Sequence, residues 1–392
     1  MRSTYRERML AVINGRPLGP VPFAPRMDLW YIANRARGTL PPGYEGLTMA
    51  QLADVLGVAC HAVRADFTMP IEDQDWALRA FGVENHPDFP YRVELRGLPI
   101  RFTREGDLMR TEIDTSAGTV TTIQERSNAM LVNGESDAHV LEYPIKSADD
   151  IEAVSEVFEH MEVIPTPQGY RAFHERVGDR GIAVAAGSIA AAPIHFFLHD
   201  LASIEQFMYL WVDERDRLLE AARRLEPFYE TCLEATIACG AEVVYWGANF
   251  DQGVTWPPFF GEQLAPWLTR VGARLRAAGM ALLCHTDGEN RMLMPLYREC
   301  GMDVAESVCP SPMTQLSLAE LRAGMPPEVT VWGGVSSVAL LESSMNDSSY
   351  GALLDDLTDV LADPRRMILG VSDNVPPDMS FKRLTMMASR FQ

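Results

Sequence analysis

Histidine, aspartate, glutamate and cysteine side chains follow several predicted strands, which is where an α/β protein places its chemistry. The stretch Cys284–Gly288 comes directly after the apolar run Met280–Leu283 and directly before a helical pattern that begins at Asn290. Because parallel strands present functional side chains at their carboxyl ends, we take His285 as the centre of the predicted site.

Ligand-type side chains accumulate after the strands that neighbour this stretch. His285 and Asp287, Glu306 and Cys309, and finally Asp373 bring imidazole, thiolate and carboxylate groups, all of which zinc accepts. We therefore predict a catalytic zinc held by His285 and Cys309 with Glu306 or Asp373 as a carboxylate ligand. Asp287 is expected to orient His285, and Asp373 either binds the metal or hydrogen-bonds the substrate. In the alternative interpretation, Cys309 is a buried thiol and Glu306 and Asp287 bond the backbone.

The other candidate residues also follow predicted strands. Those expected to contact the substrate are Arg26, Trp30, Asp66, His195 and Trp246, and those expected to take part in catalysis are Asn249, Asp251 and Asp287. An arginine with aromatic neighbours suits an anionic or aromatic substrate, although a salt-bridged arginine on a loop explains Arg26 equally well.

Strand-like and helical segments alternate along most of the chain, as in parallel βα units. The predicted strands are 21–23, 59–63, 181–186, 242–245, 281–284, 304–306, 330–332 and 367–370. Eight such units without a Gly-x-Gly-x-x-Gly turn favour a closed (β/α)₈ TIM barrel. Residues 91–124 alternate with period two and contain glycine turns, which predicts an inserted antiparallel β-meander. No linker divides the chain, so residues 1–392 are expected to form a single domain.

The composition narrows the range of partners. With 34 basic and 54 acidic residues the net charge is −20, so nucleic acid and membrane surfaces are not expected partners. No signal peptide or membrane-spanning run is evident, which predicts a cytoplasmic protein that binds a small molecule. The six cysteines lack zinc-ribbon spacing and are expected to be thiols.

Several stretches together resemble the uroporphyrinogen decarboxylase superfamily, which includes cobalamin-linked methyltransferases. The stretches that carry the resemblance are Arg6–Pro17 with Val21–Pro22, Trp246–Asp251 with Pro257–Phe260, His285–Gly288 and Ile368–Asp378. The resemblance covers nearly the whole chain and implies a (β/α)₈ barrel with the site at its carboxyl-end mouth.

The chain departs from the better-known branches of this superfamily. Relatives that methylate coenzyme M hold zinc with a His-x-Cys pair and a later cysteine, and the matching positions here are His285, Asp287 and Asp373. Carboxylates thus replace both thiolates, and carboxylates suit a harder oxygen substrate. The pattern resembles the methyltransferase components of O-demethylases, which implies zinc and removal of a methyl group from a small methoxylated substrate. A proton donor, Glu306 or Asp251, could assist the leaving oxygen in place of the metal.

The methyl acceptor is expected on another molecule. The chain lacks an Asp-x-His-x-x-Gly cobalamin signature, so a corrinoid carried by a partner protein, or a folate, would receive the methyl group. A homodimer is one option for assembly.

Two other functions remain open. One is a metal-independent decarboxylase or lyase, in which Arg26 binds a carboxylate and Asp66 or Asp251 stabilises a protonated intermediate. The other is a binding barrel without chemistry.

Overall fold

A six-stranded parallel sheet forms the centre of the molecule, in the strand order β12-β11-β10-β9-β8-β7. The computed structural model describes residues 3–63, 72–135 and 138–391. The strands are β7 (Ala185–Ser188), β8 (Val243–Trp246), β9 (Ala281–His285), β10 (Val304–Val308), β11 (Thr330–Ser336) and β12 (Met367–Ser372), and each overlaps a strand predicted from the sequence. Nearly all their residues are buried, as expected for parallel strands that are covered on both faces.

The two remaining predicted strands, 21–23 and 59–63, form only single bridges within the described residues. Phe23 forms a parallel bridge with Leu369 of β12, and Ala62 forms one with Ala183, just before β7. Between them, the Ala59 N–H donates to the Phe23 carbonyl at 2.8 Å. Pro22 lacks an N–H donor, which shortens any ladder in the first segment. The closed eight-stranded barrel predicted from the sequence is therefore not confirmed.

An antiparallel sheet is inserted before the parallel strands, but its strands are not all those of the predicted 91–124 meander. Its strand order is β2-β3-β4-β5, formed by β2 (Ile100–Glu105), β3 (Leu108–Thr115), β4 (Gly118–Glu125) and β5 (His139–Glu142). The first predicted strand, β1 (Tyr91–Leu95), instead pairs antiparallel with β6 (Met161–Pro165). Gly97 turns the chain away from β1 at a positive φ of 79°, which separates β1 from β2.

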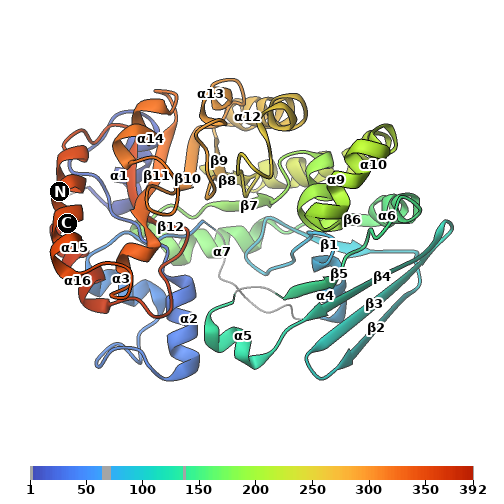
Figure 1. Ribbon diagram of the computed structural model, residues 1–392, viewed down its shortest axis with the longest axis horizontal. Coiled ribbons are helices and arrows are strands. Elements are labelled where there is room, and N and C mark those ends of the chain that lie inside the picture. The colour runs from blue at the N-terminus through green and yellow to red at the C-terminus, as the bar shows by residue number, and fades with distance from the viewer. Residues whose placement is uncertain (1–2, 64–71, 136–137, 392) are drawn as a thin grey trace.

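Helices flank the six-stranded sheet, and the inserted sheet forms one end of the molecule with α6 packed against β3 and β4 (Figure 1). In chain order they are α1 (Tyr5–Ile13), α2 (Asp28–Arg37), α3 (Met49–Leu56), α4 (Asp73–Arg79), α5 (Asn128–Asn133), α6 (Asp150–Glu159), α7 (Pro167–Val177), α8 (Pro193–Phe196), α9 (Ile204–Asp213), α10 (Arg215–Ala238), α11 (Pro257–Phe259), α12 (Ala265–Ala277), α13 (Met294–Tyr297), α14 (Leu318–Gly324), α15 (Asp347–Val360) and α16 (Phe381–Arg390). Both termini lie at the end of the molecule opposite the inserted sheet (Figure 1).

Local sequence signals explain several helix starts. Thr4 caps α1 and Glu7 completes the capping box. Ser317 and Glu320 form the same motif at the start of α14. None of the described helices has the length and apolar character needed to cross a membrane.

A second buried cluster lies between the parallel strands and α1. It joins side chains from the parallel strands, among them Tyr245, Leu283 and Trp332, to Met9 and Val12 of α1. The first helix therefore packs against residues of the central sheet.

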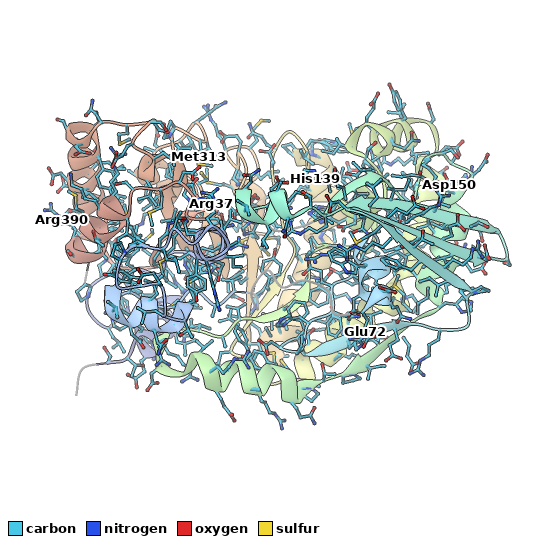
Figure 2. The ribbon with its side chains drawn as sticks, turned by 90° about the horizontal axis from the view of Figure 1, so that it is seen from below. Arg37, Glu72, His139, Asp150, Met313 and Arg390 are labelled. Atoms are coloured by element: carbon cyan, nitrogen blue, oxygen red, sulfur yellow. The ribbon has the colours of Figure 1, made fainter. Side chains whose placement is uncertain are left out.

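The inserted sheet shares the main hydrophobic core. Ile113 of β3 and Val120 of β4 belong to the same buried cluster as residues of the parallel sheet and of α10. Seen from below, His139 and Asp150 lie on the side of the molecule away from Arg390 in the last helix (Figure 2). The insertion is thus peripheral in position but continuous with the core.

We predict that the protein unfolds in one transition and that Ile113→Ala lowers its free energy of unfolding by about 2–5 kcal/mol, the usual cost of such a truncation in a core. Ile113 is 1% exposed, whereas Leu108 on the same strand is 43% exposed, so Leu108→Ala is the matched control and should change stability little. Urea unfolding followed by circular dichroism measures both. Two separate transitions, with only one shifted by Ile113→Ala, would show that the insertion folds as its own unit.

Candidate functional site

Glu306 forms the centre of the candidate site, because its buried carboxylate bonds two histidines. Its Oε2 lies 2.5 Å from His285 Nδ1 and its Oε1 lies 2.9 Å from His61 Nε2. His285 and Glu306 are direct neighbours across β9 and β10, so the sheet register itself brings them together. All three side chains are at most 7% exposed.

The pairing changes the protonation of both groups. Burial acts to raise the pKa of Glu306, but the charge and hydrogen bond of His285, with a further bond from His61, lower it to about 2. Burial likewise acts to lower the pKa of His285, yet Glu306, Asp287 and Asp373 raise it well above its usual 6.5. The pair is therefore a carboxylate and an imidazolium at neutral pH.

The other nitrogen of His285 faces two carboxylates. Nε2 lies 3.3 Å from Asp373 Oδ1 and 3.7 Å from Asp287 Oδ2. Asp373 also accepts a hydrogen bond from Arg26 at 2.7 Å, and its side chain remains 41% exposed while that of Arg26 is 12% exposed. Burial acts to raise the pKa of Asp373, but Arg26 and His285 lower it well below its usual range. The proton on His285 Nε2 therefore faces the two partly exposed carboxylates of the cluster, Asp373 and Asp287.

These residues do not fit the predicted zinc site as they are arranged. Both Glu306 oxygens are taken by histidines, and Asp373 is paired with Arg26. Burial raises the pKa of the Cys309 thiol to about 12, with Asp287 and Asp373 adding to the effect, which opposes the thiolate that zinc needs. In the described ranges no three His, Cys, Asp or Glu side chains are grouped so that they could hold a metal ion. The zinc ion stays a prediction from the sequence.

Asp251 and Asn249, predicted to be catalytic, lie in the loop after β8. Asp251 Oδ1 accepts the Gly253 N–H and Oδ2 accepts the Glu289 N–H, both at 2.7 Å. The carboxylate therefore joins the loop after β8 to the loop that follows His285. Asn249 has a positive φ of 57° and its amide lies 2.7 Å from His199 Nε2.

Three residues predicted to contact substrate are buried away from solvent. Trp30 is 2% exposed and stacks on Phe381 of α16. Trp246 is fully buried and donates its Nε1–H to the Tyr229 hydroxyl. His195 is 1% exposed, and its Nδ1 accepts the Ala191 N–H at 3.0 Å.

The remaining substrate-contact candidates are Arg26, which pairs with Asp373, and Asp66. Asp66 lies outside the described residues. Of the predicted set, the structure brings Arg26, His285, Glu306 and Asp373 together, with Asp287 beside them.

His61 is the residue of this cluster that sequence reasoning missed. It lies within the predicted strand 59–63, and a search for histidines inside strand segments as well as after them would have found it. Its ring also packs edge-on against Trp332, with 5.0 Å between the ring centroids. Tyr245 was missed too, and its ring lies 6.3 Å from that of His285.

Comparison with known proteins shows the fold. The chain matches the solved structure of a methyltransferase from Methanosarcina mazei with a TM-score of 0.54 and 14% identity, over 99% of this chain and 98% of that one. A dipeptide epimerase from Methylococcus capsulatus, solved with a magnesium ion, aligns over 76% of this chain and 78% of that one with a TM-score of 0.21 and 14% identity, too low to carry an argument. No protein-family model and no curated protein matches the sequence.

We predict that Glu306→Gln lowers the free energy of unfolding near pH 5.5 by about 3 kcal/mol or more, because it leaves buried histidines without their carboxylate. The pKa of Glu306 is lowered to about 2, so its contribution is present above its usual pKa and lost as pH falls toward 2. The raised pKa of His285 contributes below 6.5 and is lost as pH rises through the raised value. Urea unfolding between pH 3 and 9 measures both trends.

The matched control is Glu328→Gln, since Glu328 is an exposed carboxylate away from this cluster. It should follow the wild-type pH profile. Equal stability and equal pH dependence for Glu306→Gln and wild type would contradict the ion-paired assignment.

Proposed function

We propose that this protein is a methyltransferase-type enzyme that removes a methyl group from the oxygen of a small methoxylated substrate, with His285 as the proton donor. The observation that carries the proposal is the line Glu306–His285–Asp373, in which an imidazolium is fixed at Nδ1 and presents Nε2 toward the exposed end of the site. The fold shared with a methyltransferase from Methanosarcina mazei is consistent with it.

The chemistry follows from the arrangement. As the bond between methyl carbon and oxygen breaks, its electron pair stays on the oxygen, which takes the Nε2 proton of His285 while the methyl group bonds to the acceptor. A positioned acid of this kind accelerates such a step by roughly 10²–10⁴-fold. Glu306 stabilises the imidazolium before the transfer, and its low pKa means that Glu306 itself is not the donor. Asp287, whose side chain is 32% exposed and lies 3.7 Å from His285 Nε2, can assist reprotonation.

The acceptor in this proposal is a corrinoid held by a partner protein, or a folate, which supplies a nucleophile for the methyl group. Neither acceptor needs to contact the His285 side chain for His285 to act as the acid. No step is assigned to zinc, because the described side chains do not form a ligand set.

The same proposal places the site in a closed (β/α)₈ barrel of the uroporphyrinogen decarboxylase superfamily type. The bridges of Phe23 with Leu369 and of Ala62 with Ala183 support it, since segments 21–24 and 59–62 lie between the two edges of the six-stranded sheet. His61 lies within the second of these segments, and Arg26 comes two residues after the first.

One observation favours a second candidate function, a metal-independent carboxy-lyase. Arg26 is a nearly buried cation whose partner Asp373 is partly exposed, so a substrate carboxylate could approach the same guanidinium. In that reaction Asp373 would stabilise a protonated intermediate. Assays that follow demethylated product and released carbon dioxide in parallel distinguish the two reactions.

We predict that His285→Gln lowers kcat for demethylation by roughly 10²–10⁴-fold, because the proton donor is lost. The measurement uses a methoxylated aromatic compound and a reduced cobalamin acceptor. Because the pKa of His285 is raised, wild-type activity should persist through pH 7 and fall only in the alkaline range. His139→Gln, at an exposed histidine, is the control. Carbon dioxide release without methyl transfer would support the lyase, and unchanged turnover in His285→Gln would exclude His285 as the acid.

The zinc that the sequence predicts can be tested separately. From the geometry we predict much less than one zinc per chain in purified protein, and equal metal content in wild type, His285→Ala and Cys309→Ser. Elemental analysis by mass spectrometry measures this. One zinc per chain that is lost in His285→Ala would overturn the metal-free arrangement and restore the zinc-dependent reaction.

A further inference from the structure

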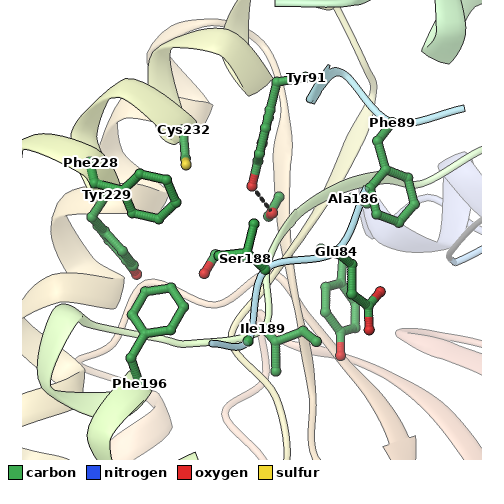
Figure 3. A pocket seen from close by; sticks show the side chains of 14 residues that line it. Glu84, Phe89, Tyr91, Ala186, Ser188, Ile189, Phe196, Phe228, Tyr229 and Cys232 are labelled. Carbon is green, nitrogen blue, oxygen red and sulfur yellow. Dashed lines mark hydrogen bonds between the residues drawn. The ribbon is translucent and has the colours of Figure 1, made fainter. Parts of the chain in front are cut away.

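Two cavities of the described structure differ sharply in the room that they offer. The cavity between the ends of β7 and β8, helix α10 and the chain that enters β1 is lined by aromatic side chains, among them Tyr91, Phe196 and Tyr229 (Figure 3). It has room for about 30 Å³, enough for a few water molecules. The cavity at the amino ends of β8, β9 and β10, here called the amino-end pocket, has about 590 Å³. Pockets that bind small molecules usually measure about 300–1,000 Å³.

The amino-end pocket lies at the opposite end of the sheet from His285. Val243 begins β8, Ala281 begins β9 and Asp303 comes directly before β10, and all three residues line the pocket. His285 ends β9, four residues after Ala281, which corresponds to about 13 Å along a strand. The pocket is therefore separate from the candidate site.

Three arginines line the amino-end pocket: Arg276 at the end of α12, Arg298 directly after α13 and Arg366 directly before β12. None of them forms an ion pair with a carboxylate in the part of the chain that the structure describes. Arg276 donates to backbone carbonyls, that of Gly301 at 3.0 Å, and Arg366 donates to the Ile13 carbonyl. Each guanidinium carries five N–H donors, so most of these donors are left for a ligand or solvent.

The side chain of Arg366 is positioned by an unusual backbone conformation. Its φ is 54°, in the left-handed region that residues other than glycine rarely adopt. The guanidinium lies against Gly15, where an added Cβ would come within 2.9 Å of Nη2. Two backbone positions with positive φ, at Gly15 and Arg366, thus hold this cation at the pocket.

One carboxylate of the pocket is shared by two of the arginines. Asp303 accepts the Leu282 N–H at 2.8 Å, which fixes its place in front of β9. Burial raises the pKa of Asp303, and the charges of Arg276 and Arg366 act against that rise. Both guanidiniums therefore lie near the same side chain and near each other.

The other acidic side chains leave the pocket with an excess of positive charge. Glu242 is paired with Arg6, whose Nε donates to it at 3.1 Å. The three arginines then face two further carboxylates, those of Asp303 and the exposed Glu328. In a chain with a net charge of −20, such a local excess attracts an anion to this place.

We propose that the amino-end pocket binds a small phosphate ester, with its phosphate group among Arg276, Arg298 and Arg366. A phosphate monoester carries close to two negative charges and three terminal oxygens, which suits three guanidiniums better than a carboxylate does. The volume exceeds that of phosphate alone, and Leu10 and Met280 supply apolar surface for the organic part. The site does not depend on the proposed reaction, because it is remote from His285.

Isothermal titration calorimetry with phenyl phosphate, benzoate and benzyl alcohol tests the proposal on the full chain without any turnover. Phenyl phosphate should bind more tightly than benzoate, which has one charge and two oxygens, and benzyl alcohol should not bind measurably. Benzoate that binds as tightly as phenyl phosphate would overturn the assignment of a phosphate group.

Arginine variants locate the bound anion. Arg298→Gln breaks no described hydrogen bond, so it should fold as wild type and weaken phenyl phosphate about tenfold or more. Arg276→Gln should weaken it similarly. The matched control is Arg365→Gln, because Arg365 is 74% exposed, pairs with Asp363 and does not line the pocket. Its affinity should equal that of wild type.

Two results would contradict the assignment of this site. One is equal affinity for phenyl phosphate in wild type, Arg298→Gln and Arg276→Gln. The other is an affinity that falls in Arg26→Gln but not in Arg298→Gln, which would place the anion at the carboxyl ends of the strands instead.

Discussion

The buried carboxylate of Glu306 is the constraint on which the rest of the site depends. A carboxylate in a strand of the central sheet loses its hydration, and a lone buried charge there would be strongly unfavourable. His61 on one side and His285 on the other satisfy both of its oxygens. Because His285 is fixed at Nδ1, its Nε2 has a defined direction, toward Asp373 and Asp287. One buried charge thus sets the ionisation and the orientation of the catalytic candidate.

The surrounding elements hold this arrangement from several sides. Asp251 joins the loop after β8 to the loop after β9 through two backbone N–H groups, which limits how far the chain after His285 can move. The register of β9 against β10 places His285 directly beside Glu306.

Charge balance holds the side chains around His285 together. Three carboxylates, Glu306, Asp373 and Asp287, lie around His285, and Arg26 supplies a permanent positive charge at Asp373. The carboxylates of this cluster are thus paired with a guanidinium and an imidazolium.

The sequence by itself determined the six parallel strands, because apolar runs ending in polar residues follow from local burial and the strand period. It also singled out His285, Arg26, Glu306 and Asp373, which the structure brings together. Only the tertiary structure decided their partners. The register of β9 against β10 and the contact of His61 with Glu306, which is 245 residues away in the sequence, depend on long-range packing. The burial of Trp30, Trp246 and His195 was likewise decided by packing, because an aromatic residue after a strand has the same local pattern whether it lines a site or fills a core. Pairing of β1 with β6 depended on a turn at Gly97 whose direction no alternating pattern encodes.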